Sequence, residues 1–354
     1  MTEQAGVGEF SGNGVAEIGR LYQMIFSYPI SQIITTAVRL GLPDRLAGPA
    51  APAGSLATAV GASERSLRRL LRALTALGIT AELEPDRFAL TALGRFLQSD
   101  APGSVHAPAL LAGHPVMWQA WGSLEQTVRQ GSPGFEQVFG QPLFSYLADH
   151  RDLGELFNSV LAARTQAVVP QIAANFDFSL CGRVMDVGGG DGTLLAAILA
   201  AYPAVTGVLM DKLETAEAAS KILAAQGLAS RCDIETGDFF ESIPGGCDTY
   251  VLKNILHDWS DEQAAIILRN CRSAVPADGR LLVMTMLRDD QPASDPVSGM
   301  GAAVSEMEMM LLTHGGERTI DEYARLFEEA HFRHSGTHLV AHYPDYYVIE
   351  LHPQ

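Results

Sequence analysis

The C-terminal half of the chain alternates short apolar runs with longer stretches in which apolar residues recur every three or four positions. Short runs of this kind are typical of buried parallel strands, and the longer stretches are typical of the helices that cover them. The pattern therefore predicts an α/β domain with a doubly wound, mostly parallel, Rossmann-like sheet. The expected strands are 184–187, 205–210, 232–235, 248–252, 280–286, 338–342 and 346–351, and the expected helices are 193–201, 214–226 and 261–274.

The first half of the chain has a mainly helical pattern. Residues 15–42 are apolar at helical spacing, residues 54–97 have the order of a winged helix, and residues 105–176 are again helical. The changes of pattern predict three parts. These are an N-terminal winged-helix domain over 1–104, a helical connector over 105–178 and the α/β domain over 179–354.

The second helix of the predicted winged helix carries an apolar stripe and four arginines, Arg65, Arg68, Arg69 and Arg72. Such a helix could read DNA. The whole chain, however, has 24 basic and 41 acidic residues and a net charge of −17, which opposes binding to phosphate backbones and anionic lipid surfaces. We therefore expect a packing and dimer-forming module, with no nucleic-acid or membrane partner.

The composition is that of a globular protein, with 47% hydrophobic and 18% charged residues. The 4 cysteines show no C-x-x-C spacing. The first residues are acidic and rich in glycine, unlike a signal peptide, and no run of about 18 apolar residues follows them. These features predict a reduced, cytoplasmic protein.

The first predicted strand leads into a glycine-rich turn, Gly188-Gly-Gly-Asp-Gly192. Glycine lets a ligand lie against the backbone, because no Cβ intervenes and a positive φ costs little. Thr193 stands where the dinucleotide fingerprint has its third glycine. The turn alone leaves three interpretations open: a nicotinamide cofactor, S-adenosylmethionine, or a plain tight turn.

Two carboxylates follow the next two predicted strands. Asp211, at the end of the second strand, could accept hydrogen bonds from a ribose diol. Asp238 stands beside Phe239 after the third strand, where an adenine could be sandwiched and its amino group held. Each aspartate alone could be a surface or turn residue. Polar groups after three successive strands nevertheless indicate a ligand site at one edge of the sheet.

The fourth predicted strand runs into Leu252-Lys-Asn-Ile-Leu-His-Asp-Trp259. Together with 186–192, 237–240 and Gly315-Gly-Glu-Arg-Thr319, this segment resembles the small-molecule O-methyltransferases of the plant caffeate and bacterial polyketide-tailoring type. The resemblance covers most of the chain, including the winged-helix module. It implies a homodimer that transfers a methyl group from S-adenosylmethionine to a hydroxyl, most simply a phenolic one, of a small aromatic or polyketide-like metabolite.

The resemblance also implies roles for individual residues. The S-adenosylmethionine site would be formed by Gly188, Gly190, Asp211, Asp238, Phe239 and Lys253. His257 would be the general base, Glu317 would orient it, and Asp258 would lie beside it. The chemistry suits a histidine, because a phenol with a pKa near 10 is almost wholly protonated at neutral pH and a neutral imidazole can take its proton. An isolated His257 would instead be read as a core histidine.

The acceptor pocket is expected to be lined by large and polar residues of the helical connector and of the motif: Met117, Trp118, Phe157, Leu161, Arg164 and Asn254. Aromatic residues at helical spacing also fit a plain core. Arg164 could bind a carboxylate of the acceptor or merely cap a surface.

One position departs from the plant members of the family. Thr285 follows the fifth strand where they have a second glutamate, and a threonine cannot stabilise an imidazolium by charge. Glu317 or Asp258 would then have to do so. Two alternatives stay open: a homologue that binds S-adenosylmethionine but catalyses hydroxylation, decarboxylation or cyclisation, and a winged-helix regulator that senses a small ligand.

No metal site is predicted. The spacing of His331, His334, His338 and His342 would suit one face of a helix. Gly336 and the β-branched residues around it argue against a helix there, so the four histidines are not expected to converge.

Overall fold

The computed structural model describes residues 12–288, 296–342 and 345–354. The chain folds into two compact units that divide between Met117 and Trp118. The boundaries predicted at 104 and 178 remain predictions about domain organisation. Among the residues described, no helix is long and apolar enough to cross a membrane.

The N-terminal unit contains the helix, turn, helix and hairpin that the pattern predicted. Its helices are α1 (Gly12–Ile25), α2 (Ser27–Arg39), α3 (Leu42–Arg45), α4 (Ala53–Val60), α5 (Glu64–Ala76), the 3₁₀ turn η1 (Gly94–Leu97) and α6 (His106–Ala112). Its sheet has the order β1-β3-β2, from β1 (Ala51–Pro52), β2 (Thr80–Glu84) and β3 (Arg87–Leu90). This arrangement confirms the winged-helix order.

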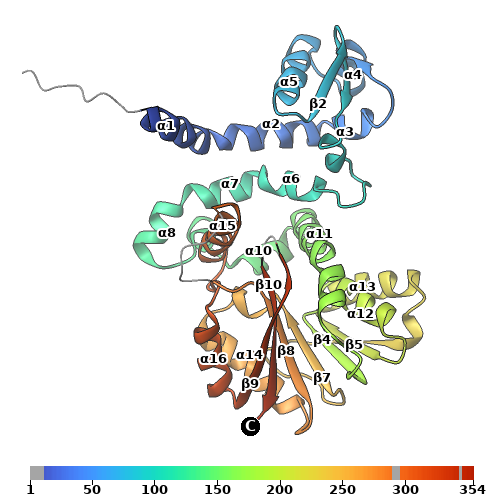
Figure 1. Ribbon diagram of the computed structural model, residues 1–354, viewed down its shortest axis with the longest axis vertical. Coiled ribbons are helices and arrows are strands. Elements are labelled where there is room, and N and C mark those ends of the chain that lie inside the picture. Colours follow the sequence, from blue (N-terminus) through green and yellow to red (C-terminus); the bar gives the residue numbers. More distant parts are fainter. Residues whose placement is uncertain (1–11, 289–295, 343–344) are drawn as a thin grey trace, which may run out of the picture. The chain divides into compact units, whose positions relative to one another are not determined.

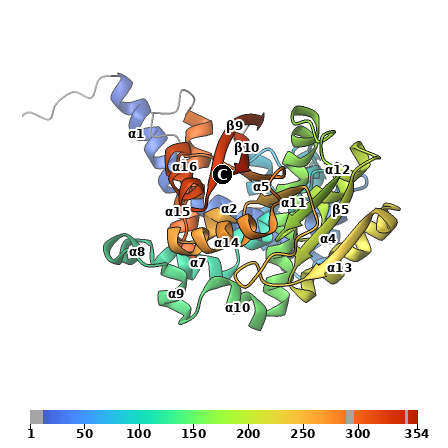
Figure 2. The same ribbon diagram turned by 90° about the horizontal axis from the view of Figure 1, so that it is seen from below.

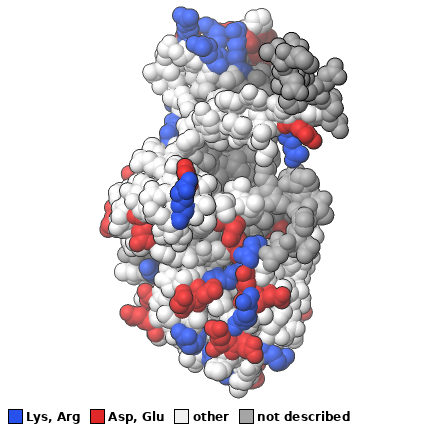
Figure 3. Space-filling view, turned by 90° about the vertical axis from the view of Figure 1, so that its left-hand side faces the viewer, with Lys and Arg blue, Asp and Glu red and all other residues white. Residues whose placement is uncertain are grey.

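Helix α5 buries its apolar stripe and turns its arginines outward. Leu67, Leu71 and Leu74 are buried. Arg68 pairs with Asp86 of the hairpin turn and with Glu64 one helical turn earlier, so part of the basic stripe is neutralised within the unit. In the C-terminal unit, acidic and basic side chains are interspersed over the face shown in Figure 3.

The C-terminal unit is built on a seven-stranded sheet of order β6-β5-β4-β7-β8-β10-β9 (Figure 1). The strands are β4 (Arg183–Val187), β5 (Thr206–Asp211), β6 (Cys232–Thr236), β7 (Thr249–Lys253), β8 (Arg280–Thr285), β9 (Phe332–Ala341) and β10 (Tyr346–Pro353). The first five are parallel, whereas β10 pairs antiparallel with both β8 and β9. The prediction of a mostly parallel sheet is confirmed.

Helices cover both faces of this sheet (Figure 2). One core lies against α11 (Arg151–Asn175), α12 (Thr193–Ala201) and α13 (Leu213–Ala225), and the other lies against α14 (Asp261–Ala274) and α16 (Ile320–Glu329). The unit also contains α8 (Leu124–Gln130), α9 (Gly134–Phe139), α10 (Leu143–Asp149), α15 (Pro296–Leu312) and the 3₁₀ turns η2 (Ala229–Arg231) and η3 (Leu256–Asp258), while α7 (Pro115–Gly122) spans the division between the units.

The strand order explains where a ligand can bind. From β4 the chain adds β5 and β6 on one side, then returns to place β7 on the other side of β4. The two connections leave a crevice at the carboxyl ends of these strands, where doubly wound folds bind their ligands.

The structure differs from the prediction between β8 and β10. Strand β9 begins at Phe332, well before the predicted start at 338, and helices α15 and α16 precede it where no element was predicted. The start of α16 carried a recognisable signal, because Thr319 and Glu322 form a capping box. The sequence of helix α15 contains no comparable signal, because apolar residues lie around most of its circumference and form no distinct apolar face.

Candidate functional site

The glycine-rich turn after β4 has three glycines with positive φ: Gly188 at 69°, Gly190 at 60° and Gly192 at 79°. A Cβ on Gly188 would lie 2.6 Å from Cδ1 of Ile255, so a larger residue would displace that side chain, and the positive φ would also strain the larger residue. A Cβ on Gly190 would meet nothing within 4 Å. No neighbouring atom fills the space beside Gly190, so a ligand could approach its backbone closely.

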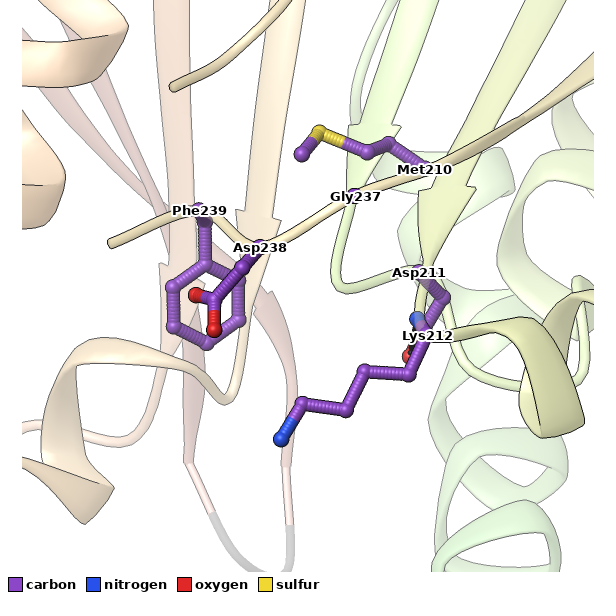
Figure 4. Close-up of a pocket in the computed structure, with 6 residues that line it drawn as sticks. All are labelled: Met210, Asp211, Lys212, Gly237, Asp238 and Phe239. Carbon is purple, nitrogen blue, oxygen red and sulfur yellow. Dashed lines mark hydrogen bonds between the residues drawn. The ribbon is translucent and has the colours of Figure 1, made fainter. Parts of the chain in front are cut away.

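A pocket lies at the ends of β5 and β6. Figure 4 shows Asp211 and Lys212 on one side of it and Asp238 and Phe239 on the other, with Met210 and Gly237 between them. Three residues predicted to hold S-adenosylmethionine, Asp211, Asp238 and Phe239, thus line one pocket.

Backbone hydrogen bonds fix both carboxylates of this pocket. Asp211 accepts from the N–H of Gly190 at 2.9 Å and from the N–H of Lys212 at 2.7 Å. Asp238 accepts from the N–H of Phe240 at 2.8 Å. A carboxylate has about four lone-pair sites, so each can also accept hydrogen bonds from the hydroxyls or the amino group of a ligand.

Beneath the glycine-rich turn lies a buried carboxylate that the sequence did not single out as a site residue. Oδ2 of Asp186 has no hydrogen-bond partner among the residues described, and burial raises the pKa of Asp186 to about 7 although Lys253 opposes the shift. Burial likewise lowers the pKa of Lys253 to about 8, and its Nζ donates to Oγ1 of Thr165 at 2.9 Å. An unpartnered buried oxygen fits a donor-rich ligand group such as an ammonium.

The predicted base lies just beyond β7. The chain passes through Asn254, which has a φ of 53°, into the short turn η3 that carries His257. Nδ1 of the buried His257 lies 3.1 Å from Oε1 of the buried Glu317. On the other side of the ring, Nε2 lies 3.7 Å from Oδ1 of Asp258, which is an ion-pair distance but too long for a hydrogen bond.

The two carboxylates determine the charge of this histidine. Burial by itself lowers the pKa of His257, but Asp258 and the hydrogen bond to Glu317 outweigh it, so the pKa lies above its ordinary value. Burial also raises the pKa of Asp258 to about 6, against the attraction of His257. The imidazole is thus set to gain a proton more readily than a histidine in water.

Glu317 is itself held in place by α15. Oγ of Ser305 donates to Oε1 of Glu317 at 2.9 Å, the same oxygen that faces His257. The backbone N–H of Glu317 donates to Oε2 of Glu306 at 2.6 Å. The acidic side chain at 306 therefore fixes the backbone from which Glu317 projects.

The segment around Glu317 also clamps η3. The N–H of Gly316 donates to the carbonyl of His257 at 2.9 Å, and a Cβ on Gly315 would lie 1.9 Å from that carbonyl oxygen. Arg318 donates to the carbonyls of Leu256 and Trp259, each at 2.7 Å. In the motif Gly315-Gly-Glu-Arg, the glycines thus allow the close backbone approach, Glu317 supplies the carboxylate, and Arg318 holds η3 in place.

Thr285 ends β8 and is buried. It supplies no charge. Asp258 is the carboxylate found within ion-pair distance of Nε2 of His257, so it is the candidate for the second negative charge beside the base.

The residues predicted for the acceptor pocket have different surroundings. Phe157 packs edge-on against Phe144 with ring centroids 6.4 Å apart, while Leu161 is 40% exposed. Nη2 of Arg164 pairs with Oε2 of Glu308 at 3.2 Å. Asn254 accepts a hydrogen bond from Tyr346. Met117 and Trp118 stand on either side of the division between the units, so their place in the pocket remains a prediction.

A second pocket was not predicted. It opens onto Asp258 and is walled by Leu143, Phe144, Trp259 and Leu312, with the ion pair between Glu136 and His314 also lining it. Trp259 belongs to the Leu-His-Asp-Trp motif, so its place at the site could have been predicted from the sequence. The other walls come from α9, α10 and the end of α15, which no sequence pattern brings together.

The four histidines considered as metal ligands lie on or beside β9. No helix was predicted for this segment, and β9 is a strand. Within the described part of the chain, no three histidine, cysteine, aspartate or glutamate side chains are grouped to hold a metal ion. His342 instead faces Asp345 at 3.0 Å, and His334 lies 2.8 Å from Oγ1 of Thr337.

Comparison with known proteins agrees with this geometry. The model of the O-methyltransferase domain family matches residues 121–333, and that of the O-methyltransferase dimerisation domain matches residues 22–100. The chain is 40% identical over 316 residues to O-demethylpuromycin-O-methyltransferase of Streptomyces alboniger, covering 89% of this chain and 83% of the relative. It is 36% identical over 312 residues to the phenazine O-methyltransferase PhzM of Lysobacter antibioticus, covering 88% and 90%.

Solved structures show the same fold. The mitomycin 7-O-methyltransferase MmcR superposes with a TM-score of 0.88 at 34% identity, over 97% of this chain and 100% of that one. The O-methyltransferase NcsB1, solved with S-adenosylmethionine and 2-hydroxy-5-methyl naphthoic acid, superposes with a TM-score of 0.77 at 28% identity, over 92% and 96%. The chain therefore belongs to the O-methyltransferase family, which uses S-adenosylmethionine, and combines that family's catalytic sheet with its N-terminal dimerisation domain.

Proposed function

We propose that this protein methylates a phenolic hydroxyl of a small aromatic or polyketide-like metabolite, with His257 as the general base. The observation that carries the proposal is the buried pair of His257 and Glu317, with Nδ1 and Oε1 3.1 Å apart, beside a pocket that reaches Asp258. A histidine that only fills the core would need neither Asp258 as a second carboxylate beside it nor a neighbouring pocket.

The cofactor site would be formed by the glycine-rich turn and the strand ends already described. Gly188 and Gly190 would offer open backbone, Asp211 would accept from ribose hydroxyls, and Asp238 with Phe239 would hold the adenine. Lys253 and the unpartnered Oδ2 of Asp186 would face the polar amino-acid end. S-adenosylmethionine, when bound, supplies an electrophilic methyl group.

The protein's own part in the reaction is to remove a proton. A carboxylate only accepts hydrogen bonds, so Nδ1 of His257 must carry the hydrogen that faces Glu317, and the lone pair is then on Nε2. The acceptor hydroxyl gives its proton to Nε2 of His257 as its oxygen attacks the methyl carbon that the bound cofactor would supply. Glu317 and Asp258 then stabilise the imidazolium, an effect within the roughly 10²- to 10⁴-fold usual for a general base.

The acceptor would lie in the second pocket, which opens onto Asp258. Phe144 and Trp259, with ring centroids 5.8 Å apart, offer aromatic walls to a flat ring system. Phe157, Leu161, Arg164 and Asn254 would extend this wall. Relatives named for O-demethylpuromycin, phenazine and mitomycin biosynthesis support a small aromatic acceptor.

We propose a homodimer formed through the N-terminal unit. The match to the dimerisation domain supports this, and so does a row of exposed apolar side chains along α1 and its junction with α2. Leu21, Tyr22, Ile25 and Phe26 are each more than half exposed. Large exposed apolar patches mark interfaces. A cytoplasmic enzyme without nucleic-acid or membrane partners accords with the acidic composition.

The test is an assay of the full-length protein with trideuteromethyl-labelled S-adenosylmethionine and a panel of phenols, naphthols and hydroxyphenazines. We expect S-adenosylhomocysteine and a product heavier by one trideuteromethyl group. Unlabelled products that are hydroxylated, decarboxylated or cyclised would support the non-methylating alternative, which Thr285 suggests. Salt-dependent retention on DNA without turnover would support the regulator.

A further inference from the structure

The turn that carries the base begins with a residue in an unusual conformation. Asn254 has a φ of 53°, in the left-handed region that side chains other than glycine rarely adopt. Asparagine tolerates this region better than most residues, but the surrounding structure must still stabilise it. Asn254 forms a bend immediately after β7, only three residues before His257.

Two hydrogen bonds hold Asn254 in this conformation. Its backbone N–H donates to the carbonyl of Met284 at 2.9 Å. Its side-chain Oδ1 accepts from the phenol of Tyr346 at 2.7 Å. The same phenol oxygen lies 3.0 Å from the carbonyl of Met284, so Tyr346, Asn254 and β8 meet at one point.

Tyr346 is well placed to act as a fixed support. It is the first residue of β10, and it is only 3% exposed. The body of β10 is held by its own backbone pairing with β8, for example Val348 opposite Met284. The backbone pairing holds the strand, and at the start of β10 the phenol hydroxyl adds a contact to Asn254 and to the carbonyl of Met284.

The position of Asn254 affects both halves of the site. The next residue, Ile255, lies so close to Gly188 that a Cβ there would be 2.6 Å from its Cδ1. Two residues further on is His257. A change of φ and ψ at Asn254 would move the base relative to the glycine-rich turn, and with it the distance between the acceptor and the methyl donor.

We infer that Tyr346 is a positioning residue: its phenol holds Asn254 in the left-handed conformation and thereby sets His257 relative to the glycine-rich turn. The inference rests on the proposed function for its activity readout. It also assigns the two ends of the Asn254 amide. Oδ1 is used by Tyr346, and Nδ2 remains as the group that could serve the acceptor pocket for which Asn254 was predicted.

The test is a double-mutant cycle with Tyr346→Phe and Asn254→Gly, because glycine adopts a positive φ without help. A matched control is Tyr202→Phe, which removes another phenol that donates to a carbonyl, that of Phe176 at 3.2 Å, at the end of α12. Each full-length variant is assayed with the phenolic acceptor found in the turnover screen. Its melting temperature, its KM for S-adenosylmethionine and the NMR titration of the His257 side chain are also measured.

We expect Tyr346→Phe to lower kcat by about 10-fold or more, since misplacing a reacting group by about 1 Å can cost 10²-fold. KM for S-adenosylmethionine should change little, and the melting temperature should fall no more than in Tyr202→Phe. In the N254G background the same change should cost less than about 2-fold, because the support is no longer needed.

Equal losses of kcat in the two backgrounds would overturn the inference, as would a loss in Tyr346→Phe no larger than in the control. The NMR titration does not depend on an acceptor. Tyr346→Phe should shift the His257 signal in the wild-type background and leave it in place in the N254G background. If no phenol is turned over, the proposed function fails while this comparison still decides the positioning role.

Discussion

Nδ1 of His257 lies 3.1 Å from Oε1 of Glu317, although 60 residues separate the two along the chain. The pair is buried, and Oε1 of the same carboxylate also accepts a hydrogen bond from Ser305. A carboxylate on Nδ1 leaves the opposite ring nitrogen free to take a proton. Most of the predictions below concern this pair and the strand ends beside it.

Replacing the base should abolish most turnover without affecting cofactor binding. We expect His257→Ala to lower kcat by about 10² or more, because a general base typically contributes 10²- to 10⁴-fold. Calorimetric titration should show nearly unchanged affinity for S-adenosylhomocysteine. His342→Ala is the matched control, since His342 faces Asp345 at an exposed position. Turnover equal to wild type in His257→Ala would remove the base assignment.

Neutralising Glu317 should alter the pH profile as well as the rate. The pKa of His257 is raised, so the base stays protonated, and inactive, up to a higher pH than an ordinary histidine. In Glu317→Gln one of the two carboxylates that raise the pKa of His257 is lost while Asp258 remains, so the pKa falls and the acidic limb of kcat/KM should move to lower pH. The rate should fall by about 10-fold or more, because the amide can favour the wrong tautomer.

The exposed Glu328 on α16 supplies the control for this experiment. Glu328→Gln should leave both the rate and the acidic limb in place. An acidic limb that does not move in Glu317→Gln would show that Glu317 does not set the charge of His257.

Asp186 should make stability depend on pH. Its pKa is raised from an ordinary 3.8 to about 7, so its contribution to stability is fully present below about pH 4 and is lost as pH rises through 7. In the absence of cofactor, the free energy of unfolding of wild type relative to Asp186→Asn should fall across this interval. The slope can reach at most about 1.4 kcal/mol per pH unit.

Urea unfolding of wild type and Asp186→Asn at several pH values measures that difference. Lys253 keeps its charge over most of the same interval, because its own pKa is about 8, and so it does not reverse the slope. A constant difference between pH 4 and 7 would mean that Asp186 is ionised throughout.

Asp211 should contribute directly to cofactor affinity. Asp211→Ala removes the carboxylate that accepts from Gly190 and that would accept from the ribose hydroxyls. Hydrogen bonds to a charged group are each worth about 1.5–3 kcal/mol, so the Kd for S-adenosylmethionine should rise roughly 10- to 100-fold. Asp233→Ala is the control, because that carboxylate pairs with Arg183 at the start of the neighbouring strands.

Much of the fold could be predicted from the sequence, because it depends on local pattern. The short apolar runs predicted all seven strands of the large sheet, and the helical spacing predicted α12 and α14 with the observed ends. The hydrophobic pattern did not predict α15, since its apolar residues are spread around most of its circumference and show no periodic face. The early start of β9 was missed because His334, Ser335 and Gly336 interrupt its apolar pattern.

The sequence by itself determined the glycine-rich turn, the aspartates after β5 and β6 and the motif around His257, because each lies within one short segment whose chemistry can be read directly. Only the tertiary structure decided what those groups face. The pocket at Asp258 joins residues from α9, α10 and α15, and Tyr346 reaches Asn254 across 92 residues. Such contacts arise from the packing of α15 and from the antiparallel pairing of β10 with β8, which no local pattern specifies.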